Sequence, residues 1–280
     1  MKVKDNWIST NLLERSENSA VDFKLTINPT PILPGTFNEH CDRLAKEIFI
    51  QDTNLFLMFS GGIDSEYVLN VFIRNQIPIK PVLIVTPYNK KELVFAIRKL
   101  KTENISPIIV EYTEEKIWPI ITKYCKNHNW YASPWYALLN HAAGQFTDQG
   151  TVITGDGEPI LFFADDDGFK WPGLRYNYIL ESQFYLMCHV SQKIINFFLY
   201  DKQMYYSLLN ELINLNGYSQ TIKCKVYGLD FRPKIFVADE FTYIANRLLP
   251  KNNTVTSISP HVTSIKRALE STTPFVFGLK

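Results

Sequence analysis

The sequence lacks long apolar runs, a pattern of paired cysteines and an excess of charge of either sign. The longest apolar runs, such as residues 55–59, fall well short of the ~18 residues of a membrane span, and the N-terminal segment is polar. We therefore expect neither membrane insertion nor a secretory signal. The four Cys residues are widely and irregularly spaced, which favours reduced thiols in a cytoplasmic protein.

Charge and composition narrow the class of protein further. With 29 Lys and Arg against 28 Asp and Glu, the net charge of +1 creates no overall field that would attract nucleic acid or membrane. Hydrophobic residues make up 46 % of the 280 residues and aromatic residues 14 %, which is typical of a globular chain with a sizeable core. At ~150 residues per domain, this length fits one large domain or two small ones.

Short apolar segments alternate with amphipathic helical segments through the first half of the chain. Strands are predicted at 54–59, 81–85, 108–110 and 151–154. The helices between and before them are predicted at 38–50, from about 64, at 93–100, from near Pro119 and at 135–148. Such alternation is typical of βαβ units, so we expect an α/β fold with a mostly parallel sheet flanked by helices.

The pattern changes at both ends of this region. Residues 1–37 are expected to form an irregular arm or a small β element. Beyond about 175 the apolar spacing is mainly helical, with stripes at 184–191, 204–215 and 241–248 and a short extended piece at 222–237. We therefore divide the chain into an N-terminal arm and helix, a core, and a largely helical C-terminal region packed on it: 1–48, 49–175 and 176–280.

The segment Ser60-Gly61-Gly62-Ile63-Asp64-Ser65 carries the chemistry, because it joins a predicted buried strand to a helix. The two glycines let the backbone approach a ligand closely, and the helix aims unpaired N–H groups and its dipole at the same place. Ser60 and Ser65 add hydroxyl donors, so the segment predicts an anion site of phosphate size. Asp64 either caps the helix or holds a metal ion shared with the phosphates.

This segment is neither a Walker A loop nor a dinucleotide fingerprint. It resembles the SGGxDS pyrophosphate loop of the PP-loop ATP pyrophosphatase superfamily and matches all five fixed positions. The resemblance implies a Rossmann-like (HUP-type) sheet in which the loop follows the first strand. It also implies ATP and Mg²⁺ as cofactors, with Ser60, Gly61, Gly62, Asp64 and Ser65 at the nucleotide.

A second glycine turn, Gly155-Asp156-Gly157-Glu158, follows the predicted fourth strand. Asparagine synthetase-like members carry an acidic G-x-G-x-D-E turn at the corresponding place, which helps to bind magnesium pyrophosphate. In this chain Pro159 and Ile160 replace the Asp-Glu pair, so the acidic residues stand in a shifted register. The resemblance implies that Gly155 and Gly157 bind the nucleotide and that Asp156 joins Asp64 at the metal. It also implies that Asp64, Asp156 and Glu158 are catalytic.

In several relatives a late lysine reaches the phosphates, and Lys266 is our candidate for that role. Four other basic residues compete with it: Lys170, Arg175, Arg232 and Lys234.

The resemblance implies adenylation of a substrate oxygen with release of pyrophosphate, followed by nitrogen transfer and release of AMP. Lys2 stands where glutamine-dependent asparagine synthetases carry their cysteine nucleophile, so the expected enzyme is an amide ligase without a glutaminase domain. Its partners would be a small-molecule acceptor and ammonia, an amine or a nitrogen-delivering protein. It is also similar to compact phage-encoded members, which would place it in the host cytoplasm.

Two alternatives stay open. The basic face of the helix at 90–101 supports a nucleobase- or tRNA-modifying adenylating enzyme. The third hypothesis is a nucleotide-binding module that lacks catalysis and acts through a partner.

Overall fold

The computed structural model describes most of the chain, including both glycine turns. The described residues are 4–10, 23–128, 134–159, 161–163, 172–174, 193–215, 219–231 and 262–279. All structural statements below refer to these residues.

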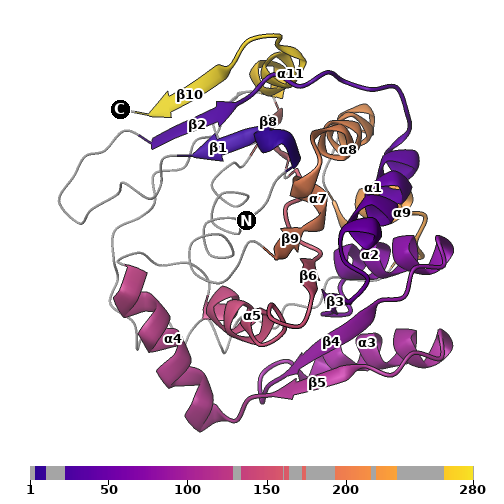
Figure 1. Cartoon of the computed structure of the whole chain (residues 1–280), viewed down its shortest axis with the longest axis vertical. Coiled ribbons are helices and arrows are strands. Elements are labelled where there is room, and N and C mark those ends of the chain that lie inside the picture. The colour runs from indigo at the N-terminus through magenta and orange to yellow at the C-terminus, as the bar shows by residue number, and fades with distance from the viewer. Residues whose placement is uncertain are drawn as a thin grey trace.

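Five parallel strands form the central sheet, in the order β5-β4-β3-β6-β9 (Figure 1). The strands are β3 (Leu55–Met58), β4 (Lys80–Val85), β5 (Ile108–Glu111), β6 (Thr151–Thr154) and β9 (Ile194–Asn196). Every residue of β3 and β6 is buried, as expected for strands covered on both faces. The predicted α/β fold with a parallel sheet flanked by helices is confirmed.

Alternate residues of β3 pack into two separate apolar clusters, one on each face of the sheet. Leu55 and Leu57 belong to the first cluster, and Phe56 and Met58 to the second. The first cluster is built with α1 (Phe37–Gln51), α2 (Ile63–Arg74), α3 (Lys90–Thr102), α7 (Phe197–Tyr200), α8 (Lys202–Asn214), α9 (Gln220–Tyr227) and α11 (Val262–Glu270). The second is built with α4 (Glu114–His128) and α5 (Pro134–Gly144).

Segments from both halves of the sequence form a small antiparallel sheet beside the core (Figure 1). Its order is β1 (Ile8–Thr10), β2 (Phe23–Ile27) and β10 (Phe275–Leu279), so the predicted arm contains a β element. A short 3₁₀ helix (Lys4–Asn6) precedes it, and β7 (Leu161–Phe163) pairs with β8 (Pro172–Leu174) elsewhere.

Two predicted boundaries are wrong. Helix α4 begins at Glu114 rather than near Pro119, because the Thr113 carbonyl already accepts from the N–H groups of Lys116 and Ile117. Pro119 lies inside the helix on an exposed position, where water can bond the carbonyl that proline leaves without a donor.

The extended piece predicted at 222–237 is helical over its first six residues, which belong to α9. The Ser219 hydroxyl accepts from the Ile222 N–H at the start of α9, and Gly228 ends the helix in the left-handed conformation at φ 64°. Residues 228–231 of that piece form a turn and a segment without regular structure, and residues 232–237 lie outside the described residues, as do the stripes at 184–191 and 241–248.

The remaining stripe, at 204–215, is confirmed, because its residues up to Asn214 belong to α8. Cys41 and Cys224 are free and buried, as expected for reduced thiols. None of the described helices combines the length and the apolar character needed to cross a bilayer.

Candidate active site

The first turn (residues 60–65) leaves β3 and opens α2, in the strand–loop–helix arrangement predicted from the sequence. Gly61 has φ 77°, a value that side chains disfavour, and an added Cβ would lie 2.7 Å from the Ala96 backbone N of α3. Gly62 is the N-cap residue of α2 and makes no side-chain cap bond. The turn therefore lies against α3 and presents backbone rather than side chains at the helix start.

Hydroxyl groups fix the shape of this turn. The Gly62 N–H donates to Ser60 Oγ at 3.1 Å, and the buried Ser65 hydroxyl donates to the Gly62 carbonyl at 3.0 Å. The two hydroxyl oxygens lie 3.1 Å apart. The first-turn N–H groups of α2 have no helical carbonyl to bond, so they can bind an anion beside these hydroxyls.

Asp64 does not cap α2, which removes one of the two predicted roles of this residue. Its Oδ1 atom instead lies 2.5 Å from Lys223 Nζ and accepts the Tyr227 hydroxyl at 2.9 Å. Burial raises the pKa of Asp64 above its ordinary value, against the opposing effect of Lys223. The carboxyl group of Asp64 is thus the ion-pair partner of Lys223 at the start of α2.

The second turn (residues 155–158) follows β6, the parallel neighbour of β3, and packs directly on the first. An added Cβ at Gly155 would lie 2.8 Å from the Ser65 backbone N, so only glycine permits this approach. Glu158 is 9 % exposed and accepts from Lys223 Nζ at 3.0 Å. Burial, followed by the charges of Glu158 and Asp64, raises the pKa of Asp156 to about 7.

Lys223 of α9 joins the two turns and is the functional residue that the sequence analysis missed. It is 5 % exposed and pairs with both Asp64 and Glu158. Burial disfavours its charged form, but the two carboxylates together raise its pKa above the ordinary value. The signals that could have found it are Ser219 and Gly228, whose capping chemistry marks a helix where an extended piece was predicted.

The structure places Lys266, the lysine predicted to contact the phosphates, away from the two glycine turns. Lys266 lies on α11, which packs against β8 and α8, and Figure 1 places this helix beside the small sheet, well away from α2. Among the described residues it pairs with none of Asp64, Asp156 and Glu158. The competing candidates lie outside the described residues: Lys170, Arg175, Arg232 and Lys234.

The carboxylates at the turns fit a magnesium ion that arrives with phosphates. Within the described ranges, no three His, Cys, Asp or Glu side chains converge as ligands of a metal ion. Magnesium needs fewer protein ligands, because it is commonly bound through one or two carboxylates with phosphates and water completing the set. Asp64 and Asp156 are the candidate pair for this role, because the charge of Asp64 helps to raise the pKa of Asp156. Glu158 shares the Lys223 ammonium with Asp64.

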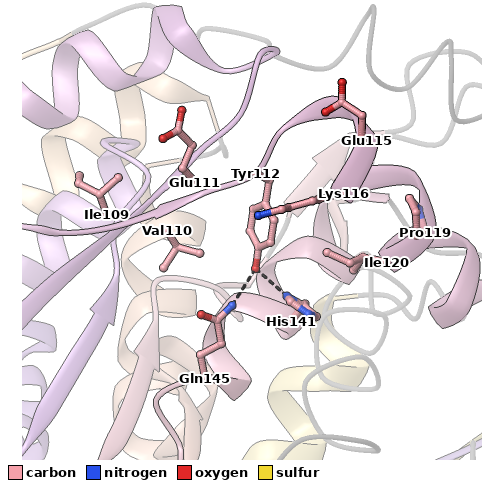
Figure 2. Close-up of a pocket in the computed structure, with 10 residues that line it drawn as sticks. All are labelled: Ile109, Val110, Glu111, Tyr112, Glu115, Lys116, Pro119, Ile120, His141 and Gln145. Atoms are coloured by element: carbon pink, nitrogen blue, oxygen red, sulfur yellow. Dashed lines mark hydrogen bonds between the residues drawn. The ribbon is translucent and has the colours of Figure 1, made fainter.

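A separate cavity of about 610 Å³ opens beside β5, between α4 and α5 (Figure 2). Tyr112, directly after β5, has its hydroxyl 2.7 Å from His141 Nδ1 and accepts from Gln145 Nε2 at 3.1 Å. Burial, with a smaller effect of Lys123, lowers the pKa of His141 below its ordinary value. Strand β4 lies between β5 and β3, so β5 and β3 are roughly 10 Å apart across the sheet.

Comparison with known proteins finds distant structural similarity. No protein-family model matches the chain, and no curated protein matches it. The chain is similar to an NH₃-dependent NAD synthetase from Campylobacter jejuni, at 19 % identity and TM-score 0.31, over 71 % of this chain and 97 % of that one. It is also similar to an NMN synthetase from Francisella tularensis, at 14 % identity and TM-score 0.31, over 80 % and 98 % of the two chains.

A third similar structure is a predicted subunit of tRNA methyltransferase from Methanocaldococcus jannaschii, at 15 % identity and TM-score 0.28. The match covers 51 % of this chain and 66 % of that one. These TM-scores are low, so the functional argument rests on the residues at the two turns.

Proposed function

We propose that the chain is a PP-loop ATP pyrophosphatase that adenylates a substrate oxygen, releases pyrophosphate, and then transfers nitrogen and releases AMP. It would act as an asparagine synthetase-like amide ligase without a glutaminase domain, with ATP and Mg²⁺ as cofactors. One observation carries the proposal: Lys223 bonds Asp64 of the first turn and Glu158 of the second, at the start of α2. A buried cation, carboxylates and unpaired N–H groups thus meet at one place.

The start of α2 supplies the donors for the phosphates. Its first-turn N–H groups and the hydroxyls of Ser60 and Ser65 would bind the β- and γ-phosphates, where the helix dipole also favours negative charge. Gly62 leaves room for this contact, because an added Cβ there would meet only Ser60 Oγ, at 3.2 Å. Binding of the β- and γ-phosphates at the start of α2 would leave the α-phosphorus facing the acceptor.

Lys223 would stabilise part of the negative charge that develops on the leaving pyrophosphate. Its ammonium bonds two carboxylates now, and an arriving triphosphate offers further oxygens of the same charge. We propose that Lys223 exchanges its bond to Asp64 for a bond to a phosphate oxygen. A fixed cation at the departing pyrophosphate stabilises the charge that develops in the transition state.

Asp64 and Asp156 would hold the magnesium, with Glu158 beside them. Bound magnesium would neutralise the pyrophosphate as it leaves. Release of Lys223 from Asp64 frees that carboxylate for this role. Burial raises the pKa of Asp156 to about 7, so near neutral pH this group holds a proton more readily than an ordinary carboxyl group does.

The proposed reaction balances in two steps. A carboxylate oxygen of the acceptor attacks the α-phosphorus, and the bond to the β-phosphate bridging oxygen breaks, with its electron pair leaving on pyrophosphate. Ammonia or an amine then attacks the acyl carbon, and the carbon–oxygen bond to AMP breaks. The second step yields an amide, AMP and a proton.

Product analysis tests the proposal. Purified protein is incubated with ATP, Mg²⁺, ammonium and a panel of carboxylate acceptors, and nucleotides are separated by chromatography. We expect AMP and pyrophosphate, with turnover that depends on the acceptor because water is a poor substitute for a positioned nucleophile. ADP and inorganic phosphate as the main products, lost in Asp64→Asn and Ser65→Ala, would overturn it.

One observation favours a second candidate, a tRNA- or nucleobase-modifying adenylating enzyme. Helix α3 exposes four basic residues: Lys90, Lys91, Arg98 and Lys101. If this candidate is right, the protein is retained on immobilised tRNA and released steeply as salt rises. ATP binding with no turnover for any acceptor would leave the third hypothesis, a nucleotide-binding module that acts through a partner.

A further inference from the structure

Asp64 receives two hydrogen-bond donors from one helix. Lys223 and Tyr227 are four residues apart on α9, so they lie on the same face, and both reach Oδ1 of Asp64. The distances are 2.5 Å from Lys223 Nζ and 2.9 Å from Tyr227 Oη. The second carboxylate oxygen, Oδ2, takes part in neither contact.

The two donors differ in how firmly they are held. Tyr227 is 6 % exposed, and its ring lies 4.5 Å from the Tyr67 ring, 5.7 Å from Phe198 and 6.2 Å from Phe37, measured between centroids. The interplanar angles of these three pairs are 20°, 15° and 28°. A tyrosine has two side-chain torsions, and near-parallel rings from three helices restrict both of them.

Lys223, in contrast, carries its charge on a flexible four-carbon stem. Its ammonium can leave Asp64 for a new anion without any movement of α9. The Tyr227 hydroxyl cannot follow, because its ring is fixed against Tyr67, which lies one turn from Asp64 on α2. One donor is therefore exchangeable and the other is fixed.

We propose that Tyr227 is a positioning residue that holds the Asp64 carboxylate in its metal-binding orientation when Lys223 turns to the phosphates. The inference rests on the proposed function and adds the residue that fixes the metal ligand. Hydrogen-bond partners of metal ligands typically contribute 10–100-fold to metal affinity. Tyr227 would fill that role through a neutral hydroxyl, which leaves the negative charge of Asp64 available to the cation.

The test is a magnesium titration of Tyr227→Phe, which keeps the ring and removes only the hydroxyl. Thermal unfolding of the full chain is followed at a fixed, saturating ATP concentration while Mg²⁺ is raised from zero. The Mg²⁺ concentration at half of the ATP-dependent shift is expected to rise ~10-fold in the variant. Loss of packing alone would lower the unfolding temperature at every Mg²⁺ concentration and leave this midpoint unchanged.

Tyr206→Phe is the matched control. Tyr206 lies on α8, and its hydroxyl bonds Glu270 of α11 and neither of the two glycine turns. The variant should therefore keep the wild-type Mg²⁺ midpoint. A wild-type midpoint in Tyr227→Phe, with a normal ATP shift in the wild type, would overturn this inference alone. Absence of any Mg²⁺-dependent ATP shift in the wild type would overturn the proposed function and this inference together.

Discussion

The two glycine turns differ in almost everything except their place at the ends of neighbouring parallel strands. The first turn opens a twelve-residue helix and presents N–H groups and hydroxyls. The second turn opens no helix in the described residues, and it presents two acidic residues, Asp156 and Glu158. The first turn therefore combines an anion site with one carboxylate, Asp64, whereas the second turn contributes carboxylates alone.

Under the proposed function, this difference explains why the turns touch. A magnesium pyrophosphate group carries both charges within one small ligand, so a site for it needs both kinds of turn at contact distance. Gly155 provides that contact by packing against Ser65, and Lys223 bonds an acid of each turn. The following substitutions separate these contributions.

The largest effect is expected for Lys223→Met, which removes the cation from both turns. The buried Glu158 and the partly buried Asp64 would lose their partner, so we expect the free energy of unfolding to fall by about 3 kcal/mol and the ATP-dependent shift to disappear. Urea denaturation with and without MgATP measures both. Lys266→Met is the matched control, and loss of the ATP shift in that variant alone would return the phosphate role to Lys266.

Gly155→Ala tests the contact between the turns. The new methyl group would lie 2.8 Å from backbone, which cannot move aside cheaply, so we expect about 2 kcal/mol lower stability and separation of the acids from the first turn. Gly62→Val is the comparison, since its methyl groups would enter the phosphate position and not the contact. We expect this variant to fold and to lose the ATP shift, and a full ATP shift would mean that phosphate binds elsewhere.

Asp64→Asn tests the contribution of this carboxylate to AMP formation. The amide keeps the size of the side chain and loses the charge that faces Lys223, so AMP formation should fall ~10²-fold, while nucleotide binding weakens only modestly. Glu158→Gln is measured beside it by the same chromatography. Wild-type rates in both variants would exclude these carboxylates from the reaction.

The pH dependence of stability tests the acids of the second turn. Asp156 has an ordinary pKa of 3.8, which is raised to about 7 in the folded chain, mainly by burial. Between these values the folded chain holds a proton that the unfolded chain releases, so this stabilisation is complete below about pH 4 and is lost as pH rises to about 7. Urea denaturation without metal should show this fall, and Asp156→Asn should flatten it. An unchanged slope in the variant would assign the proton elsewhere.

The smallest effect is expected for His141→Ala, in the cavity beside β5. The half-exposed ring bonds the Tyr112 hydroxyl, and losing this bond should lower stability by about 1 kcal/mol. The MgATP shift should remain at its wild-type value, because the cavity is two strands from the first turn. A lost shift would show that this cavity belongs to the nucleotide site.

The sequence predicts the first turn well because its chemistry is local: a buried strand, a glycine pair and a helix start lie within a dozen residues. The second turn is predictable because a buried strand and two glycines likewise lie close together in the sequence. Lys223 is not, since its role depends on contacts 159 and 65 residues away, with Asp64 and Glu158. The strand β9 escapes notice because three residues are too few to show a period.

The late place of α9 in the chain has a consequence for synthesis on the ribosome. Both glycine turns have emerged by residue 158, but the ammonium that neutralises them is made about 65 residues later, or several seconds at ~5–20 residues per second. Until then, the nascent sheet carries facing carboxylates without their counter-charge. Under the proposed function, the nucleotide site is therefore complete only after α9 packs on α2, which requires that translation has passed residue 227.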